Sequence, residues 1–228
     1  MKILKVSLQT KSLEKVKHFY CDLLRFPLIS ETKESVILKA GESHLAFERV
    51  ETETGEEPYY HFAFMIPSDT FREAKAWLRE KGVQLFSREN QDEFSFTDWN
   101  ATACYFYDSN GNLVEFIAHH SLDNPSDSEF DQCDILRICE VGMPVKQPFI
   151  ESRKICEPFN VDTWKGAGEG FLPIGNTHGL MILVDHERKW FPDNRMPGRF
   201  PLKVSIQGTE NAELTIEDMY VVTSVTPR

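Results

Sequence analysis

The sequence predicts an α+β fold built from a repeated unit of one strand, one helix and three strands. Three observations lead to this prediction. Several short segments alternate apolar and polar residues, two segments have one apolar helical face, and the same order of elements returns after about 56 residues, the separation of Lys5 and His61. A repeat of this size indicates a supersecondary unit that buries its apolar face against a neighbouring copy.

The first unit occupies roughly the first 50 residues. Residues 2–10, KILKVSLQT, alternate and predict a strand. Ser12 is a favourable helix N-cap, and the apolar stripe that follows it predicts a helix ending near Leu24. Three short strands are predicted after this helix, at 27–31, 35–40 and 43–50.

The second unit begins at Tyr59. YYHFAFMIP predicts a strand that ends at Pro67, and Ser68 or Asp69 caps a helix that stops at Gly82. Strands are predicted afterwards at 83–87, 101–108 and 112–120, and the DSNG turn connects the last two. Residues 1–120 are therefore predicted to form one domain of two paired units.

The remaining chain is predicted to hold a third unit. Residues 121–134 are polar and acidic, which is typical of a linker. Residues 135–228 predict a related, partial strand–helix–three-strand unit, with a helix after Pro148 and an insertion at 186–200 before its last strands.

Charge and cysteine content limit the binding partners and the cellular location that we expect. The formal net charge of −11 disfavours binding to nucleic acid or to an anionic membrane. The five cysteines are scattered and include no CxxC pair, which favours reduced thiols and a cytoplasmic location. The charged, alternating N-terminal segment does not read as a signal peptide.

Three segments within residues 1–120 carry a family resemblance. LEKVKHFYCDLL (13–24), YHFAF (60–64) and YDSNGNLVEF (107–116) resemble segments of the vicinal oxygen chelate superfamily. That superfamily includes glyoxalase I, extradiol dioxygenases, and the bleomycin and fosfomycin resistance proteins. The resemblance implies an open barrel around a small-molecule cavity. It also implies a divalent metal that chelates two neighbouring oxygens of a substrate.

The resemblance places the metal-ligand positions at Lys5, Ala46, His61 and Glu115. His61 and Glu115 keep side chains that can bind a metal. Alanine has no donor atom, and a lysine ammonium has no lone pair to offer. Since catalytic sites commonly use three protein ligands, these four positions supply one ligand too few.

Three alternatives follow for this incomplete ligand set. A further ligand could be recruited from the same strand faces, about 7 Å along, where the candidates are His44, Glu48, Gln9 and His119. Alternatively, the Lys5 ammonium could replace the metal by pairing with Glu115, because a buried charge needs a partner. In the third alternative Lys5 reaches solvent and the site is defunct.

Aromatic and basic residues suggest how a cavity could be lined and closed. Trp99, Tyr105 and Tyr107 are candidates for its wall, although aromatic residues in strands often belong to the core. The insertion at 186–200 is locally basic and could form a lid over an anionic substrate, although it also fits a solvated loop. Its cationic candidates are Arg188, Lys189, Arg195 and Arg199.

Two functions from different classes fit these observations, and neither identifies catalytic residues. The first is a lyase or dioxygenase that uses Fe, Mn, Ni or Zn on a small oxygenated substrate, with His61 and Glu115 as ligands. The second is a non-enzymatic protein that sequesters a small molecule, with Lys5 in place of a metal. An unpaired third unit could lie as a partial lid on the first two units or pair with its own copy in a second subunit; two-fold pairing is the commoner solution, so a homodimer is predicted.

Overall fold

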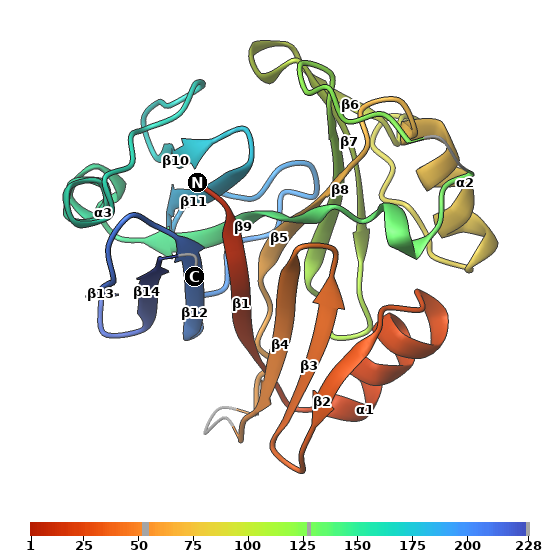
Figure 1. Ribbon diagram of the computed structural model, residues 1–228, viewed down its shortest axis with the longest axis horizontal. Coiled ribbons are helices and arrows are strands. Elements are labelled where there is room, and N and C mark those ends of the chain that lie inside the picture. The colour runs from red at the N-terminus through yellow and green to blue at the C-terminus, as the bar shows by residue number, and fades with distance from the viewer. Residues whose placement is uncertain (52–54, 127–128, 227–228) are drawn as a thin grey trace.

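The computed structural model describes residues 1–51, 55–126 and 129–226 and confirms the α+β fold with repeated units. Helices are few and strands dominate (Figure 1). The elements in chain order are β1 (Ile3–Thr10), α1 (Leu13–Val16), η1 (Lys17–Leu23), β2 (Leu28–Glu31), β3 (Ser35–Ala40), β4 (Ser43–Arg49), β5 (His61–Ile66), α2 (Phe71–Glu80), β6 (Phe94–Phe96), η2 (Thr97–Trp99), β7 (Ala101–Tyr107), β8 (Leu113–His119), η3 (Gln132–Asp134), β9 (Arg137–Val145), α3 (Pro148–Phe159), β10 (Phe171–Asn176), β11 (Gly179–Asp185), β12 (Leu202–Gln207), β13 (Ala212–Ile216) and β14 (Tyr220–Val225).

The described strands form two seven-stranded mixed sheets. Sheet A has the order β13-β14-β12-β1-β4-β3-β2, and sheet B has the order β10-β11-β9-β5-β8-β7-β6. The first unit (β1–β4) therefore lies in sheet A, and the second unit (β5–β8) lies in sheet B. The two N-terminal units, which the sequence predicted to share one cavity, are in different sheets.

The C-terminal segment completes both sheets. β9, α3, β10 and β11 form a third unit, and β9 runs antiparallel to β5 of the second unit. β12–β14 join sheet A instead, where β12 runs antiparallel to β1. Figure 1 shows these C-terminal strands on the opposite side of the molecule from α1 and α2.

Local signals explain most of the element ends. The Ser12 side chain accepts a hydrogen bond from the Lys15 amide at 3.3 Å, as expected for an N-cap. Gly82 follows α2 with a φ of +77°, which glycine adopts without strain. The strand predicted at 83–87 is wrong, because only Leu85 makes an isolated bridge, to Phe106. The edge strand β6 lies further along, at residues 94–96.

The acidic segment after β8 is anchored at one buried aromatic side chain. Phe130 packs edge-on against Trp77 of α2, with ring centroids 5.6 Å apart, and it also contacts Phe116. Asp131 and Asp134 form a capping box around η3. Phe130 therefore attaches the described end of this segment to the second unit.

Two apolar clusters hold the sheets and helices together. The larger cluster combines buried side chains of both sheets with the buried faces of the helices, including Val16, Leu78 and Ile155. The smaller cluster covers one face of sheet B, where it includes Ala63 and Ile182. None of the described helices is long and apolar enough to cross a membrane.

Candidate metal centre

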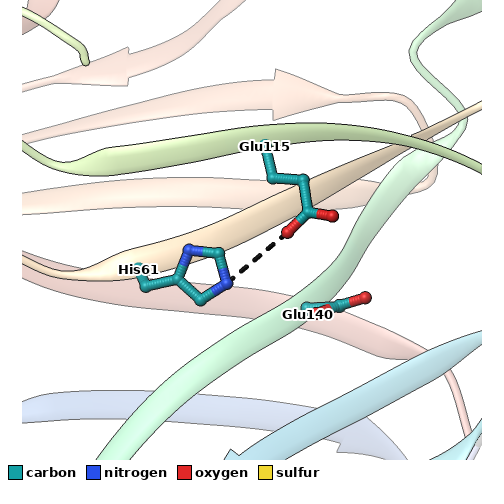
Figure 2. A group of neighbouring side chains, drawn as sticks. All are labelled: His61, Glu115 and Glu140. Atoms are coloured by element: carbon teal, nitrogen blue, oxygen red, sulfur yellow. Dashed lines mark ion pairs between the residues drawn. The ribbon is translucent and has the colours of Figure 1, made fainter. Parts of the chain in front are cut away.

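Three acidic or imidazole side chains meet on one face of sheet B. His61 on β5, Glu115 on β8 and Glu140 on β9 each offer a nitrogen or oxygen atom, and these atoms lie within 4.8 Å of one another. Their residues are only 6%, 2% and 4% exposed. Figure 2 shows the three side chains converging from neighbouring strands.

Strand register produces this convergence. β5 lies between β8 and β9, and Ala63 is opposite Glu115 on one side and Glu140 on the other. Because side chains alternate along a strand, His61 projects on the same face as Ala63. The small Ala63 side chain leaves room between the two carboxylates. Residues of three strands thus approach one point without a special loop.

The imidazole of His61 is held in a defined tautomer. Its Nδ1 lies 3.0 Å from the carbonyl oxygen of Leu113, which can only accept, so Nδ1 carries the proton. The unprotonated Nε2 lies 3.6 Å from Glu115 Oε2. A backbone carbonyl on the far ring nitrogen is the usual way of orienting a metal-binding histidine.

Burial disfavours the charged form of each of the three groups in the metal-free protein. Desolvation lowers the pKa of His61 to about 4, although its hydrogen bond to Leu113 acts in the opposite direction. Desolvation raises the pKa of Glu140 to about 8. It also raises the pKa of Glu115 well above the ordinary value. The Glu140 charge adds to that rise, and a hydrogen bond from Tyr105 opposes it.

The donor set fits a divalent cation. One oxygen of Glu140, Oε1, is buried and has no hydrogen-bond partner among the described residues. An unpartnered buried carboxylate oxygen is costly, and a bound cation would remove that cost. An imidazole nitrogen and two carboxylates are ligands that Zn, Mn, Fe and Ni accept. Three protein ligands leave open positions for a substrate or for water.

A cavity of about 640 Å³ opens above this cluster. The apolar part of its wall is almost entirely aromatic. The polar residues that line it include Ser95, Thr97, Asp98 and Arg188. Its apolar lining comprises Phe96, Trp99, Tyr105, Phe171, Ile182, Trp190 and Phe191.

Trp190 covers the histidine from the insertion between β11 and β12. Its ring centroid lies 4.9 Å from that of His61. Gly142 on β9 makes this position available, because a Cβ there would lie 2.7 Å from the Trp190 ring. Phe191 packs edge-on against Phe94 at 5.2 Å, next to Tyr105. The insertion therefore closes one side of the cavity.

Polar contacts fix this insertion to the rest of the chain. The Tyr107 hydroxyl donates to Asp193 at 2.5 Å. Arg195 donates to the Gly111 carbonyl at 2.7 Å, and its guanidinium lies 3.4 Å from the Tyr59 ring centroid. Arg199 forms an ion pair with Glu217, whereas Lys189 is exposed and does not line the cavity.

The expected pairing of Lys5 with Glu115 is wrong. Lys5 lies on β1 in sheet A and forms no ion pair with Glu115, which lies in sheet B. Ala46, on β4, also belongs to sheet A. The expectation failed because it paired the first unit with the second. In the structure the second unit pairs with the third.

The further ligand candidates also lie away from the cluster. Gln9, His44 and Glu48 belong to sheet A, where Glu48 is bonded to Lys203 at 3.2 Å. His119 is on β8, on the same face as Glu115 but four residues along. It is buried, and its ring stacks on Trp99 at a centroid distance of 6.5 Å. None of these four residues belongs to the group that could hold a metal.

Glu140 is the candidate ligand that the sequence analysis missed. It lies in the first strand of the third unit, as His61 lies in the first strand of the second. That equivalence was readable in RICEVGMPV once the third unit had been recognised. Among the cavity candidates, Trp99 and Tyr105 line the wall, but Tyr107 is 40% exposed and does not.

Known proteins share both the sequence pattern and the fold. The family described as the glyoxalase/bleomycin resistance protein/dioxygenase superfamily matches residues 2–116. Glyoxalase I from Zea mays has 11% identity and a TM-score of 0.61, covering 99% of this chain and 92% of that one. A Bacillus subtilis protein provisionally named a dioxygenase has 10% identity and a TM-score of 0.66, covering 100% and 86%.

These structural likenesses, at such low identity, show the fold alone. Both extend over nearly the whole chain, so they include the C-terminal strands that complete each sheet. No curated protein matches the sequence. The family match itself spans just over half of the residues. The chain belongs to the glyoxalase/bleomycin resistance protein/dioxygenase superfamily.

Proposed function

We propose that this protein is a divalent-metal-dependent enzyme that acts on a small molecule with two neighbouring oxygen atoms. The observation that carries the proposal is the buried convergence of His61, Glu115 and Glu140 at the wall of an aromatic cavity. His61 Nε2 and the two carboxylates would hold the ion. When bound, the ion would supply Lewis-acid stabilisation of negative charge on a substrate oxygen.

The ligand chemistry favours a lyase or isomerase over a dioxygenase. Iron oxygenases typically use two histidines and one carboxylate, whereas this cluster has one histidine and two carboxylates. A second carboxylate offers a base for moving a proton on the substrate. Glu140 suits that role because its Oε1 has no hydrogen-bond partner among the described residues.

The residues around the cluster would orient the substrate and exclude water. Tyr105 and Trp190 lie against His61, with centroid distances of 6.3 and 4.9 Å. Their rings shield the reacting face of sheet B from solvent. In such an enclosed site, electrostatic interactions with the substrate are stronger than in water.

The test is turnover by metal-free protein reloaded with Mn, Ni, Zn or Fe(II). Two substrates are tested. The hemithioacetal that forms from methylglyoxal and glutathione reports isomerisation, and catechol reports ring cleavage. We expect metal-dependent isomerisation that Glu140→Gln reduces at least about 100-fold. The matched control is His44→Ala, an exposed histidine of sheet A, which should turn over like the wild type. Ring cleavage without isomerisation would reverse the preference for a lyase.

The aromatic wall favours a second function, sequestration of a small molecule without reaction. Phe96, Trp99 and Phe171 could stack on a planar ligand. This alternative no longer involves Lys5, which lies in the other sheet. It predicts ligand binding that is equally tight with and without metal, and no turnover of either substrate.

The homodimer stays a prediction, and the structure removes its original reason. The third unit is paired with β5 of the same chain, and β12 is paired with β1. Each described unit is therefore already paired within the same chain. Light scattering at micromolar concentration measures the mass directly. A dimeric mass would indicate an interface that does not involve pairing of the third unit with its own copy.

A further inference from the structure

One cationic side chain lines the described cavity, and the metal cluster does not explain its position. Among the described residues that line the cavity, Arg188 is the only lysine or arginine. It follows β11 in a tight turn, in which its amide donates to the Asp185 carbonyl at 2.8 Å. The Glu187 amide donates to the Asp185 carboxylate at 2.9 Å. The start of the Arg188 side chain is therefore fixed at the rim.

The guanidinium of Arg188 rests on an aromatic ring of the cavity wall. Its central carbon lies 4.8 Å from the Phe171 ring centroid. A guanidinium that lies over a ring keeps its N–H groups directed outward along its edge. Arg188 is exposed as a residue, and partial desolvation of its guanidinium by the wall lowers the pKa of that group below its ordinary value. It nevertheless stays charged at neutral pH.

The other arginines of the insertion have polar protein partners, whereas Arg188 has none among the residues that the structure describes. Arg195 donates to the Gly111 carbonyl, and Arg199 pairs with Glu217. The Arg188 side chain forms no ion pair and no hydrogen bond with the described residues, although Asp98 also lines the cavity. A guanidinium that is positioned, partly desolvated and unpartnered is a binding group for an anion.

We propose that Arg188 binds an anionic group, a carboxylate or a phosphoryl oxyanion, on the molecule that enters this cavity. This inference rests on the proposed function, because it names the substrate class of the same cavity. The substrate would present two neighbouring oxygens to the metal cluster and a negatively charged group to Arg188. Planar guanidinium recognition of such oxyanions is bidentate, so Lys would replace Arg only in part.

Calorimetric titration of the metal-free protein tests this assignment. The probes are benzoate, phenylphosphonate and the neutral benzamide. We expect the wild type to bind at least one anion about tenfold more tightly than benzamide. Arg188→Gln should reduce that preference below about twofold, and Arg188→Lys should retain an intermediate preference. The tighter of the two anions identifies the carboxylate or the phosphoryl group as the preferred one.

The matched control is Arg153→Gln. Arg153 also lies over a phenylalanine, Phe149, at 4.6 Å, but it is on α3 and outside the cavity. This variant should keep the wild-type preference. A wild type that binds neither anion more tightly than benzamide would overturn the proposal, as would an unchanged preference in Arg188→Gln.

A separate variant distinguishes this inference from the proposed function. His61→Ala removes a metal ligand but leaves Arg188 in place. We expect it to lose metal binding and keep the preference for the anion. If the wild type binds no metal but shows the Arg188-dependent preference, the metal proposal fails and the anion site stands. Loss of both properties in His61→Ala would contradict an independent anion site.

Discussion

The two sheets share a strand arrangement but differ in what they place at equivalent positions. In sheet B, Ala63 of the central strand is opposite both Glu115 and Glu140. In sheet A, Ser7 of β1 occupies the corresponding central position. Counting from these two residues, the sheet A positions that correspond to His61, Glu115 and Glu140 are Lys5, Ala46 and Lys203.

Side-chain chemistry and burial together explain why, among the described residues, only sheet B has a candidate metal centre. The three candidate ligands of sheet B are almost fully buried, and Trp190 of the insertion covers His61. In sheet A the side chain of Lys203 is 60% exposed and pairs with Glu48 at 3.2 Å. Exposed charges are satisfied by water, whereas buried carboxylates need a cation or a proton. The repeated unit fixes the positions of the strands. The side chains at those positions, and the residues that bury them, determine whether a metal can bind.

The largest expected effect comes from making sheet B resemble sheet A. Glu140→Lys removes a carboxylate and puts an ammonium beside Glu115. We expect affinity for Zn or Mn to fall at least about 100-fold, beyond the 10–100-fold typical for residues that only orient ligands. The protein should stay folded, since the new Lys has a carboxylate partner. Equilibrium dialysis measures the affinity.

The reciprocal change, Lys203→Glu, is the control for that exchange. It places a carboxylate in sheet A, where Lys5 and Ala46 supply no ligand atoms. Metal stoichiometry should therefore be unchanged. Full metal affinity in Glu140→Lys would show that Glu140 is not a ligand.

The next effect is a pH dependence of stability in metal-free protein. The pKa of Glu140 is about 8 in the folded state, against about 4.5 as its ordinary value. Between these pH values the folded protein holds a proton that the unfolded chain has lost, so its stability falls as pH rises. Glu140→Gln removes this titration. Relative to wild type, it should gain on the order of a few kcal/mol between pH 5 and pH 9.

Urea unfolding in the presence of a chelator measures that difference. Glu48→Gln is the control, because Glu48 is a partly exposed ion-pair residue of sheet A. It should change the free energy of unfolding by less than about 1 kcal/mol at both pH values. Parallel pH profiles for wild type and Glu140→Gln would show that Glu140 is not buried as the structure has it.

A smaller effect is expected from the contact between sheet B and its cover. In Gly142→Ala the new Cβ would lie 2.7 Å from the Trp190 ring and 3.3 Å from the His61 Cβ. We expect a loss of about 1–3 kcal/mol in the free energy of unfolding, together with a change in tryptophan fluorescence. Gly168→Ala meets no atom within 4 Å and should be close to neutral. Equal stability of the two variants would argue against the tight cover.

The smallest effect concerns the outer attachment of the insertion. Tyr107→Phe removes the hydrogen bond to Asp193, but Tyr107 is 40% exposed, so water can replace its partner. The loss should be below about 1 kcal/mol. Because the insertion carries Trp190, acrylamide should quench tryptophan fluorescence more strongly in the variant. Quenching identical to wild type would mean that this bond does not hold the cover.

The comparison of sheets also shows what the sequence could reveal. Periodicity predicted the units and most of their strands, because a half-buried strand imposes its pattern on neighbouring residues. The family resemblance predicted His61 and Glu115. Lys5 and Ala46 were assigned to the same site because unit pairing is a long-range property, and local patterns do not encode it. The equivalent first-strand position of Glu140 could be read from the sequence, but its place beside His61 followed only from the pairing of β9 with β5.

The cover of the cavity was predicted least well. The basic residues of the insertion indicated a lid, but its main contact with the cluster is Trp190, which no charge pattern marks. The need for a glycine at position 142 becomes evident only when its close contact with the Trp190 ring is known. Such contacts depend on three-dimensional packing between segments that are far apart in the chain.

The most direct test of a single metal centre in sheet B is calorimetric titration of metal-free protein with Zn or Mn. Wild type and His44→Ala should each bind one ion with the same affinity, since His44 lies in sheet A. His61→Ala should bind at least about 100-fold more weakly. Equal binding by His61→Ala and wild type, or no binding by wild type, would contradict the assignment of His61, Glu115 and Glu140 as a metal centre.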